Sequence, residues 1–242
     1  MKKTIDVFIM AGGLNSRFGS PKYLEKIGDE TVLEKLLEMV RSTHINNIFL
    51  NPIIIFNHES TIPDNLRATI FRASKSAKGT ATMIRQYLKE FGEDNIRDSV
   101  VMWSDVIIKD KKVFERLVKT VDGHKGMVIP VVEEAEPYVS VLVDGYDIPY
   151  DFHYSKYDFI RLRKGYHDQC MFYFSADLLH RLELINRNHC GERNIMDLLK
   201  IAYHLNLPTN LIRLNQRAVE SFNTKEELLA IKKSLGSNLC VK

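Results

Sequence analysis

Short apolar runs alternate with amphipathic segments along most of this sequence, and no other feature constrains the fold as strongly. The apolar runs have the length of β-strands, and the amphipathic segments repeat their apolar residues at helical spacing. In the first amphipathic segment that spacing is shown by Val32, Leu33, Leu36, Leu37 and Val40. Alternation of strand and helix is typical of a mostly parallel sheet with helices on both faces. We therefore predict a three-layer α/β fold.

The apolar pattern also places the individual elements. We predict strands at residues 5–10, 48–56, 68–71, 99–103, 126–132, 139–143, 159–162 and 171–174. We predict helices at residues 31–41, 80–91, 111–121, 176–186, 195–204 and 225–234. Pro52 argues against a central position for all of its strand, because proline lacks the N–H group that a sheet ladder needs.

The length of the chain allows one large domain or two small ones, since 242 residues span that range. We find no internal repeat, linker or low-complexity tract, and therefore predict a single domain over residues 1–242. The amino-acid composition changes at residues 133–166, which are rich in tyrosine and aspartate. We expect this segment to form a small inserted lobe that faces the substrate.

Charge and cysteine content exclude several classes of function. The 34 basic and 31 acidic residues give a net charge of +3, and the basic residues are scattered. This gives little electrostatic reason for a nucleic-acid partner. Three cysteines are too few for a disulfide framework, and no apolar run reaches the roughly 18 residues of a membrane span. We expect a cytoplasmic protein that does not bind membranes.

The most informative segment is the glycine-rich loop that follows the first predicted strand, residues 11–22. Ligands of open α/β sheets bind outside the carboxyl ends of the strands, where this loop falls. Gly12 and Gly13 allow backbone N–H groups to approach a phosphate, and Arg17 and Lys22 add positive charge. The loop is therefore a candidate phosphate-binding site, with an ordinary glycine turn as the alternative.

Two familiar phosphate-binding motifs do not fit this loop. The dinucleotide fingerprint needs Gly-x-Gly-x-x-Gly, whereas Gly12 and Gly13 are adjacent. A P-loop needs four residues between its glycines, followed by Lys-Ser or Lys-Thr, whereas five residues separate Gly13 from Gly19 and Ser20-Pro21 follows. The loop therefore belongs to another kind of site.

The residues from Ala11 through Arg17, Gly19 and Lys22 resemble the signature of nucleotidyltransferases with the glycosyltransferase-A-like (GT-A) fold. Three further elements follow in the same order as in that superfamily: Lys78-Gly79-Thr80-Ala81, Ser104-Asp105-Val106 and Ser221-Phe222-Asn223-Thr224. The resemblance implies a Rossmann-like, GT-A-type sheet. It also implies transfer of a nucleoside monophosphate from a nucleoside triphosphate to a phosphorylated small-molecule acceptor, plausibly in the synthesis of cell-surface polysaccharide precursors.

The resemblance also implies roles for individual residues. Nucleotide-binding residues would be Ala11, Gly12, Gly13, Gly79 and Thr80. Arg17 and Lys22 would be the catalytic cations, and Asp105 and Asn223 would bind Mg²⁺. The acceptor side would include Tyr138, Gln169 and Asp197.

Structural alternatives exist for several of these residues. Thr80 could cap its helix, Asp105 could be a turn residue, and Asp197 could lie on a solvated helix face. Asn223 lies in the N-cap region of the last helix, where Thr224 and Glu227 have the spacing of a capping box.

Within that superfamily the chain resembles the N-acetylglucosamine-1-phosphate uridylyltransferases and related sugar-phosphate and cytidylyl transferases. Its departures from the uridylyltransferase pattern fall mainly on the acceptor side. Tyr138-Val139 stands in place of Tyr-Gly, Asp168-Gln169-Cys170 in place of Asn-Ala-Gly or Asn-Thr-Gly, and Ala77 in place of a glutamine. The acceptor can therefore be a sugar-1-phosphate or a non-sugar phosphate such as phosphocholine or an amino-acid phosphate, and the base stays open.

Two alternative functions remain. One is a GT-A-type glycosyltransferase, weakened by the absence of an Asp-x-Asp motif at Asp105. The other is a non-catalytic nucleotide-binding regulator. The sequence makes no prediction of the oligomeric state.

Overall fold

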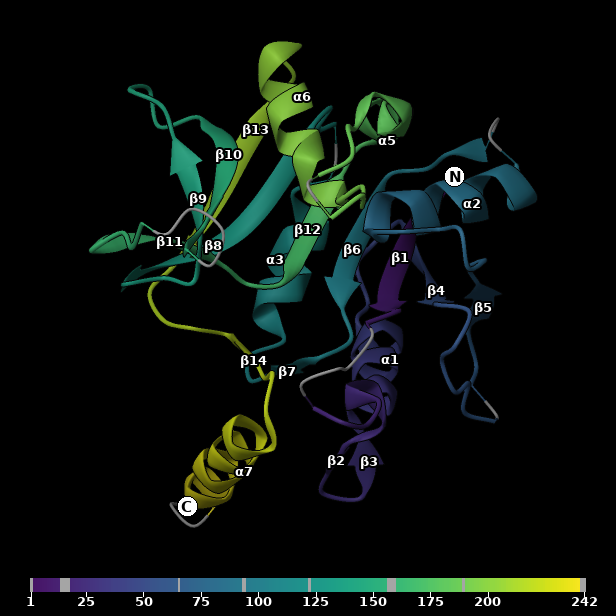
Figure 1. Ribbon diagram of the computed structural model, residues 1–242, viewed down its shortest axis with the longest axis vertical. Coiled ribbons are helices and arrows are strands. Elements are labelled where there is room, and N and C mark those ends of the chain that lie inside the picture. The colour runs from purple at the N-terminus through teal and green to yellow at the C-terminus, as the bar shows by residue number, and fades with distance from the viewer. Residues whose placement is uncertain are drawn as a thin grey trace.

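A large mixed β-sheet forms the centre of the computed structural model, which describes residues 2–13, 18–64, 66–92, 95–121, 123–155, 160–188 and 190–239 (Figure 1). Its strands follow the order β10-β9-β11-β8-β12-β6-β1-β4-β5, and β13 also pairs with β8. The strands are β1 (Lys3–Ala11), β4 (Ile48–Phe56), β5 (Thr69–Arg72), β6 (Ser99–Trp103), β8 (Met127–Ala135), β9 (Val139–Val143), β10 (Pro149–Tyr154), β11 (Lys164–Asp168), β12 (Met171–Phe174) and β13 (Thr209–Leu214).

Helices cover both faces of this sheet, which confirms the predicted three-layer α/β fold. The α-helices are α1 (Val32–Ser42), α2 (Thr80–Phe91), α3 (Lys112–Lys119), α5 (Ala176–Leu179), α6 (Leu198–His204) and α7 (Lys225–Leu239). Short 3₁₀ turns are η1 (Lys22–Leu24), η3 (Leu182–Leu184) and η4 (Ile195–Asp197). The buried side chains of α1, α3 and α7 belong to one apolar cluster, and those of α2, α5 and α6 to the other.

The sequence of β1 shows why the sheet separates two cores. Successive side chains of a strand point to opposite faces. Accordingly Ile5, Val7 and Ile9 are buried in the first cluster, whereas Phe8 and Met10 are buried in the second. A strand buried on both faces reads as a continuous apolar run, which is how β1 appears in the sequence.

Consecutive parallel pairing is found in one half of the sheet. β1 is parallel to β4 and β6, and β4 is parallel to β5. Beyond β6 the pairing becomes antiparallel through β12, β8, β11, β9 and β10, with β13 parallel to β8. The segment expected as an inserted lobe, residues 133–166, contributes β9, β10 and part of β11 to the far edge of this same sheet.

Most predicted elements agree with the structure, and five have the predicted bounds: β4, β6, β9, β12 and α2. Pro52 lies inside β4 opposite Val7, but β5 pairs only with residues from Ile53 onward. At Pro52, β4 therefore has a neighbouring strand only on the β1 side. A residue without an N–H group is accommodated there, because no strand on the β5 side needs that N–H.

Two predicted elements are wrong. Residues 160–162 are not a strand, and residue 159 lies outside the described residues; β10 and β11 provide the strands of this region instead. The helix predicted over residues 176–186 is divided into α5 and η3. Leu178, Leu182 and Ile185 are all buried, so two short turns satisfy the apolar spacing that suggested one helix.

Two small ribbons complete the fold. β2 (Lys26–Ile27) pairs with β3 (Glu30–Thr31), and β14 (Val219–Ser221) pairs antiparallel with β7 (Val106–Ile108). The β7–β14 ribbon joins the segment after β6 to the segment before α7, which places two distant parts of the chain at the same end of the sheet (Figure 1). Among the described residues, no helix is long and apolar enough to cross a membrane.

Candidate active site

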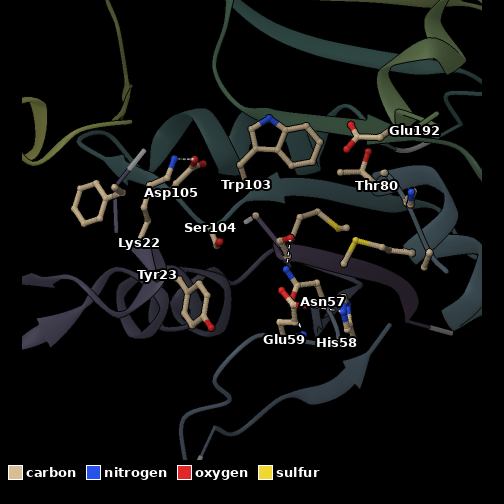
Figure 2. Close-up of a pocket in the computed structure, with 18 of the residues that line it drawn as sticks. Lys22, Tyr23, Asn57, His58, Glu59, Thr80, Trp103, Ser104, Asp105 and Glu192 are labelled. Atoms are coloured by element: carbon tan, nitrogen blue, oxygen red, sulfur yellow. Dashed lines mark hydrogen bonds and ion pairs between the residues drawn. The ribbon is translucent and has the colours of Figure 1, made fainter. Parts of the chain in front are cut away.

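A cavity of about 760 Å³ opens at the carboxyl ends of β1, β4 and β6 (Figure 2). It contains seven of the predicted site residues: Gly12, Gly13, Lys22, Gly79, Thr80, Asp105 and Asn223. These residues come from four segments that are far apart in the sequence. Because the cavity lies where ligands of α/β sheets bind, it is the candidate active site.

At one end of the cavity a lysine ammonium group lies among three oxygen atoms. Lys22 Nζ donates to Asp105 Oδ2 at 2.6 Å, to Asn223 Oδ1 at 3.3 Å and to the carbonyl oxygen of Phe222 at 3.2 Å. The Lys22 side chain is 13% exposed and that of Asp105 is 32% exposed. The structure therefore brings together one predicted catalytic residue and both predicted metal ligands.

The β7–β14 ribbon explains why Asp105 and Asn223 meet. Val106 lies opposite Ser221 in the ribbon, and the backbone N–H of Phe222 donates to the carbonyl oxygen of Asp105 at 3.4 Å. Beyond Phe222 the chain enters α7. There Glu227 N donates to Thr224 Oγ1, and Glu227 Oε2 accepts from Thr224 N, each at 3.2 Å. The predicted capping box is confirmed, and Asn223 precedes it with its side chain directed to Lys22.

The glycine loop after β1 is held by the loop after β4. Asn57 Nδ2 donates to the carbonyl oxygen of Gly12 at 2.8 Å, and Ser60 Oγ donates to that of Ala11 at 3.2 Å. A Cβ atom at Gly12 would collide with the end of the Met83 side chain on α2. Because that atom is the far end of a flexible side chain, the close approach of β1 and α2 favours glycine at this point without requiring it.

The opposite end of the cavity is formed by the start of α2. Gly79 is the N-cap residue of α2, has a φ of +87°, and would place a Cβ atom against the backbone of Arg193. Ala81 N donates to the carbonyl oxygen of Arg193 at 3.0 Å. The hydroxyl of Thr80 donates to Asn194 Oδ1 at 3.1 Å and accepts from Ile195 N at 2.9 Å. Thr80 therefore ties α2 to the segment before η4, and the alternative that it caps α2 is wrong.

Side chains of both signs line the cavity. Positive charge comes from Lys22, Lys75 and Lys78, and negative charge from Glu59, Asp105 and Glu192. Figure 2 shows Lys22 and Asp105 at one end of the cavity and Thr80 and Glu192 at the other, with Trp103 between them. A phosphate chain near Lys22 and a polar group near Glu192 could both be accommodated in such a cavity.

The predicted acceptor residues do not line this cavity. Tyr138 is exposed before β9. Asp197 is the last residue of η4 and the N-cap residue of α6, and the charges of Lys200 and Asp151 act on it. Burial raises the pKa of Asp197. Gln169 is only 1% exposed and bonds to backbone groups, so it has no surface to offer an acceptor. Ala11 is buried as the last residue of β1, next to the cavity, and Arg17 lies outside the described residues.

Sequence reasoning missed several residues that line the cavity. Asn57, His58 and Glu59 follow β4, and their position at the carboxyl end of a parallel strand was a signal available in the sequence. Trp103 ends β6 directly before the predicted Ser104-Asp105 element. Glu192 had no such signal, because its segment is brought to the cavity by tertiary contacts of Arg193, Asn194 and Ile195 with the start of α2.

The donor set at Asp105 and Asn223 fits a magnesium ion. Among the described residues there is no group of three or more His, Cys, Asp or Glu side chains that could hold a metal. Mg²⁺, however, commonly uses one or two protein oxygen ligands and completes its shell with water and substrate phosphates. An amide oxygen and a carboxylate already arranged around the cationic Lys22 ammonium meet that requirement.

A glycine loop, a lysine and a carboxylate–amide pair at the carboxyl ends of the parallel strands of a mixed sheet define a nucleotidyltransferase of the α/β class. The chain belongs to the family of MobA-like NTP transferase domains, whose family model matches residues 7–204. This match confirms the resemblance read from the sequence.

One curated relative is the bifunctional protein GlmU of Buchnera aphidicola subsp. Schizaphis graminum. It is 30% identical to this chain in an alignment that covers 56% of the chain and 34% of the relative. The chain therefore spans about a third of the length of the curated relative that it matches.

Solved structures of low sequence identity share the fold. A putative glucose-1-phosphate thymidylyltransferase from Bacillus anthracis matches with a TM-score of 0.73 and 14% identity, covering 96% of this chain and 94% of that one. A UDP-glucose pyrophosphorylase complexed with UDP-glucose matches with a TM-score of 0.71 and 12% identity, covering 98% of this chain and 100% of that one. HddC from Yersinia pseudotuberculosis matches with a TM-score of 0.67 and 14% identity, covering 96% and 99%.

Proposed function

We propose that this chain is a magnesium-dependent nucleotidyltransferase that transfers a nucleoside monophosphate from a nucleoside triphosphate to a phosphorylated small molecule and releases pyrophosphate. Residues 1–242 act as one domain in this proposal. One observation supports it above all: Lys22, Asp105 and Asn223 meet in the same cavity as the two glycine elements, Gly12-Gly13 and Gly79.

The reaction itself needs positioning and charge neutralisation more than covalent chemistry. A phosphate oxygen of the acceptor attacks the α-phosphorus of the triphosphate, and the bond from that phosphorus to the bridging oxygen of pyrophosphate breaks. Phosphate is already a competent nucleophile, so no enzyme-bound intermediate is required. The largest contribution of such a site is the placement of preorganised charges and dipoles around the phosphates.

The residues of this chain divide these tasks between the two ends of the cavity. The backbone of Gly12 and Gly13 approaches the nucleotide without an intervening side chain, and the ammonium of Lys22 neutralises phosphate charge. Gly79 and Thr80 complete the nucleotide-binding side at the start of α2, and Arg17 adds a second cation to the glycine loop. Asp105 and Asn223 would hold Mg²⁺, which would supply neutralisation of charge on the triphosphate.

The acceptor is a phosphorylated metabolite, either a sugar-1-phosphate or a non-sugar phosphate such as phosphocholine or an amino-acid phosphate. The residues available at the cavity wall are Trp103, Ser104 and Glu192 rather than the expected Tyr138, Gln169 and Asp197. An indole face beside a carboxylate suits an acceptor with an apolar or cationic portion. We propose that the product is an activated precursor of a cell-surface polymer, made in the cytoplasm, where nucleoside triphosphates are present.

A pyrophosphate-release screen tests this proposal directly. The purified chain is incubated with Mg²⁺ and each of CTP, UTP, GTP and dTTP against a panel of sugar-1-phosphates, phosphocholine and amino-acid phosphates. We expect one productive pair and a nucleoside diphosphate-linked product by mass spectrometry. Silence across the panel, with nucleotide binding retained, would favour the regulator. Release of a free nucleoside diphosphate from a sugar nucleotide donor would favour the glycosyltransferase.

A variant of the proposed metal ligand tests the mechanism. Asp105→Ala should lower turnover by about 10² to 10³-fold, the loss typical for removal of one electrostatic group of an active site. It should still fold, since the side chain of Asp105 is partly exposed. Asp29→Ala is a matched control, because Asp29 is exposed and does not line the cavity. Unchanged turnover of Asp105→Ala would refute the metal assignment.

A further inference from the structure

Gln169 is a buried polar side chain in the turn between β11 and β12, and its amide group is fully engaged with backbone. Its Oε1 atom accepts from Ala218 N at 2.9 Å and from Val219 N at 3.3 Å. Its Nε2 atom donates to the carbonyl oxygen of Asp168 at 3.2 Å. The backbone N–H of Gln169 donates to the carbonyl oxygen of Pro130 in β8 at 3.0 Å, which anchors the turn to the central sheet.

The two N–H groups that Gln169 holds lie at the beginning of β14. The carbonyl oxygen of Ala218 accepts from Lys109 N at 2.8 Å, just beyond the end of β7. The peptide group between Ala218 and Val219 is therefore bonded through its oxygen to Lys109, next to β7, and through its N–H to Gln169. β14 is only three residues long, and so short a two-stranded ribbon is marginal without further support.

The same turn also holds the segment that leads to Asp105. The carbonyl oxygen of Cys170 accepts from Trp103 N at 3.2 Å, two residues before Asp105. One turn thus contacts both segments that deliver the proposed metal ligands: β6 through its own backbone, and β14 through the side chain of Gln169. Val219 is four residues before Asn223, so a shift of β14 would move Asn223 relative to Asp105.

We infer that Gln169 is a positioning residue that braces β14 so that Asn223 lies close to Asp105, with the Lys22 ammonium between them. This inference rests on the proposed function in one respect, the use of Asn223 and Asp105 as metal ligands. Gln169 reaches the site through backbone alone and touches no substrate. Removal of its acceptor oxygen leaves two buried N–H groups unpaired at the start of β14, because Ala218 and Val219 are each 5% exposed.

The variant Gln169→Met tests this role, because methionine has a similar length and lacks the acceptor oxygen. We expect faster amide hydrogen exchange at residues 218–221. We also expect Mn²⁺, titrated alone and followed by electron paramagnetic resonance, to bind about tenfold more weakly, the scale on which partners of metal ligands act.

Thr209→Val is the matched control. Thr209 is also 5% exposed and lies in β13, away from β14. Its hydroxyl donates to the carbonyl oxygen of Pro149 in β10 at 2.9 Å. This variant also removes a buried hydrogen bond between a side chain and the backbone. It should lower the melting temperature while leaving both the exchange at residues 218–221 and the Mn²⁺ affinity unchanged.

The two measurements separate this inference from the proposed function. If Gln169→Met shows faster exchange at residues 218–221 but unchanged Mn²⁺ affinity, the positioning role is overturned. Unchanged exchange at these residues in Gln169→Met would overturn it as well. Equal weakening of Mn²⁺ binding in Thr209→Val would also overturn it, since any loss of stability would then have the same effect. If the wild-type chain itself binds no Mn²⁺, the metal assignment of the proposed function fails, and the exchange result alone decides whether Gln169 braces β14.

Discussion

The ammonium group of Lys22 lies 2.6 Å from Oδ2 of Asp105, a residue 83 positions later in the sequence. The same ammonium reaches Asn223 Oδ1 at 3.3 Å. The two oxygen donors proposed for Mg²⁺ are thus gathered around a positive charge of the protein itself. A divalent cation that uses these oxygens has to compete with Lys22, and a displaced Lys22 is then available to the phosphates.

Replacement of this lysine should therefore change activity and metal binding in opposite directions. Lys22→Met should lower turnover by about 10² to 10³-fold through the loss of phosphate neutralisation. It should also strengthen binding of Mn²⁺ in the absence of nucleotide, by up to about tenfold, because a partly buried ion pair no longer competes. Mn²⁺ titration and steady-state kinetics measure the two effects. Lys35→Met, on the outer side of α1, is the control; weaker Mn²⁺ binding in Lys22→Met would show that no competition exists.

Gly79 should tolerate no other residue. Its φ of +87° disfavours L side chains, and a Cβ atom would overlap the backbone of Arg193. We expect Gly79→Ala to lower the free energy of unfolding by more than about 2 kcal/mol in urea titrations and to raise the KM for the triphosphate. Gly145→Ala, where a Cβ atom meets nothing within 4 Å, should stay within about 0.5 kcal/mol of wild type. Equal stability of the two variants would contradict the close approach at Gly79.

Cys170 occupies a backbone conformation that suits glycine, with a φ of +55°. The related uridylyltransferase pattern has glycine at this position, so the cysteine is held in place by its surroundings. The free energy of unfolding of Cys170→Gly should lie within about 1 kcal/mol of the wild-type value. Glycine adopts the left-handed conformation without strain, and this gain offsets the loss of the side chain. The free energy of unfolding of Cys170→Val should fall by more than about 2 kcal/mol, since a β-branched residue strongly disfavours positive φ. Chemical denaturation compares them; a valine variant as stable as the glycine variant would refute this account.

Glu220 should make stability depend on acid pH. Burial alone would raise the pKa of Glu220, but its ion pairs with Lys109 and Arg217 outweigh burial and lower the pKa below its ordinary 4.5. A carboxyl with a lowered folded pKa contributes its full stability above the unfolded value and loses it as pH falls through the folded value. Melting temperature should therefore drop below pH 4.5 more steeply in wild type than in Glu220→Gln. The exposed Glu38→Gln is the control, and parallel curves for Glu220→Gln and wild type would exclude this contribution.

Much of the fold could be predicted from local patterns. β4, β6 and α2 have the predicted bounds because apolar periodicity along the chain reflects which face of each element is buried. The errors came where periodicity is ambiguous. Leu178, Leu182 and Ile185 are buried in or next to two short helical elements as well as they would be in one helix. β10 and β11 are strands whose sequences contain no apolar run.

For the site, the rule that ligands bind at the carboxyl ends of parallel strands pointed to Gly12 and Lys22, whereas the choice of Asp105 over a turn residue also needed the resemblance to nucleotidyltransferases. The acceptor side was different. Gln169 lies in a sequence element whose counterparts contact the sugar in related enzymes, yet its side chain turns inward to Ala218 and Val219. No sequence pattern near residue 169 indicates that its side chain accepts hydrogen bonds from two backbone N–H groups 49 and 50 residues later in the chain.

By itself the sequence determined the alternation of strands and helices, the glycine loop after β1 and the resemblance to nucleotidyltransferases, because these depend on residues close together in the chain. Only the tertiary structure decided that Lys22 lies between Asp105 and Asn223, and that Gln169 braces β14. Those contacts join residues 49 to 201 positions apart. Their geometry depends on the register of the β7–β14 ribbon and the packing of the sheet, which no local pattern of side chains specifies.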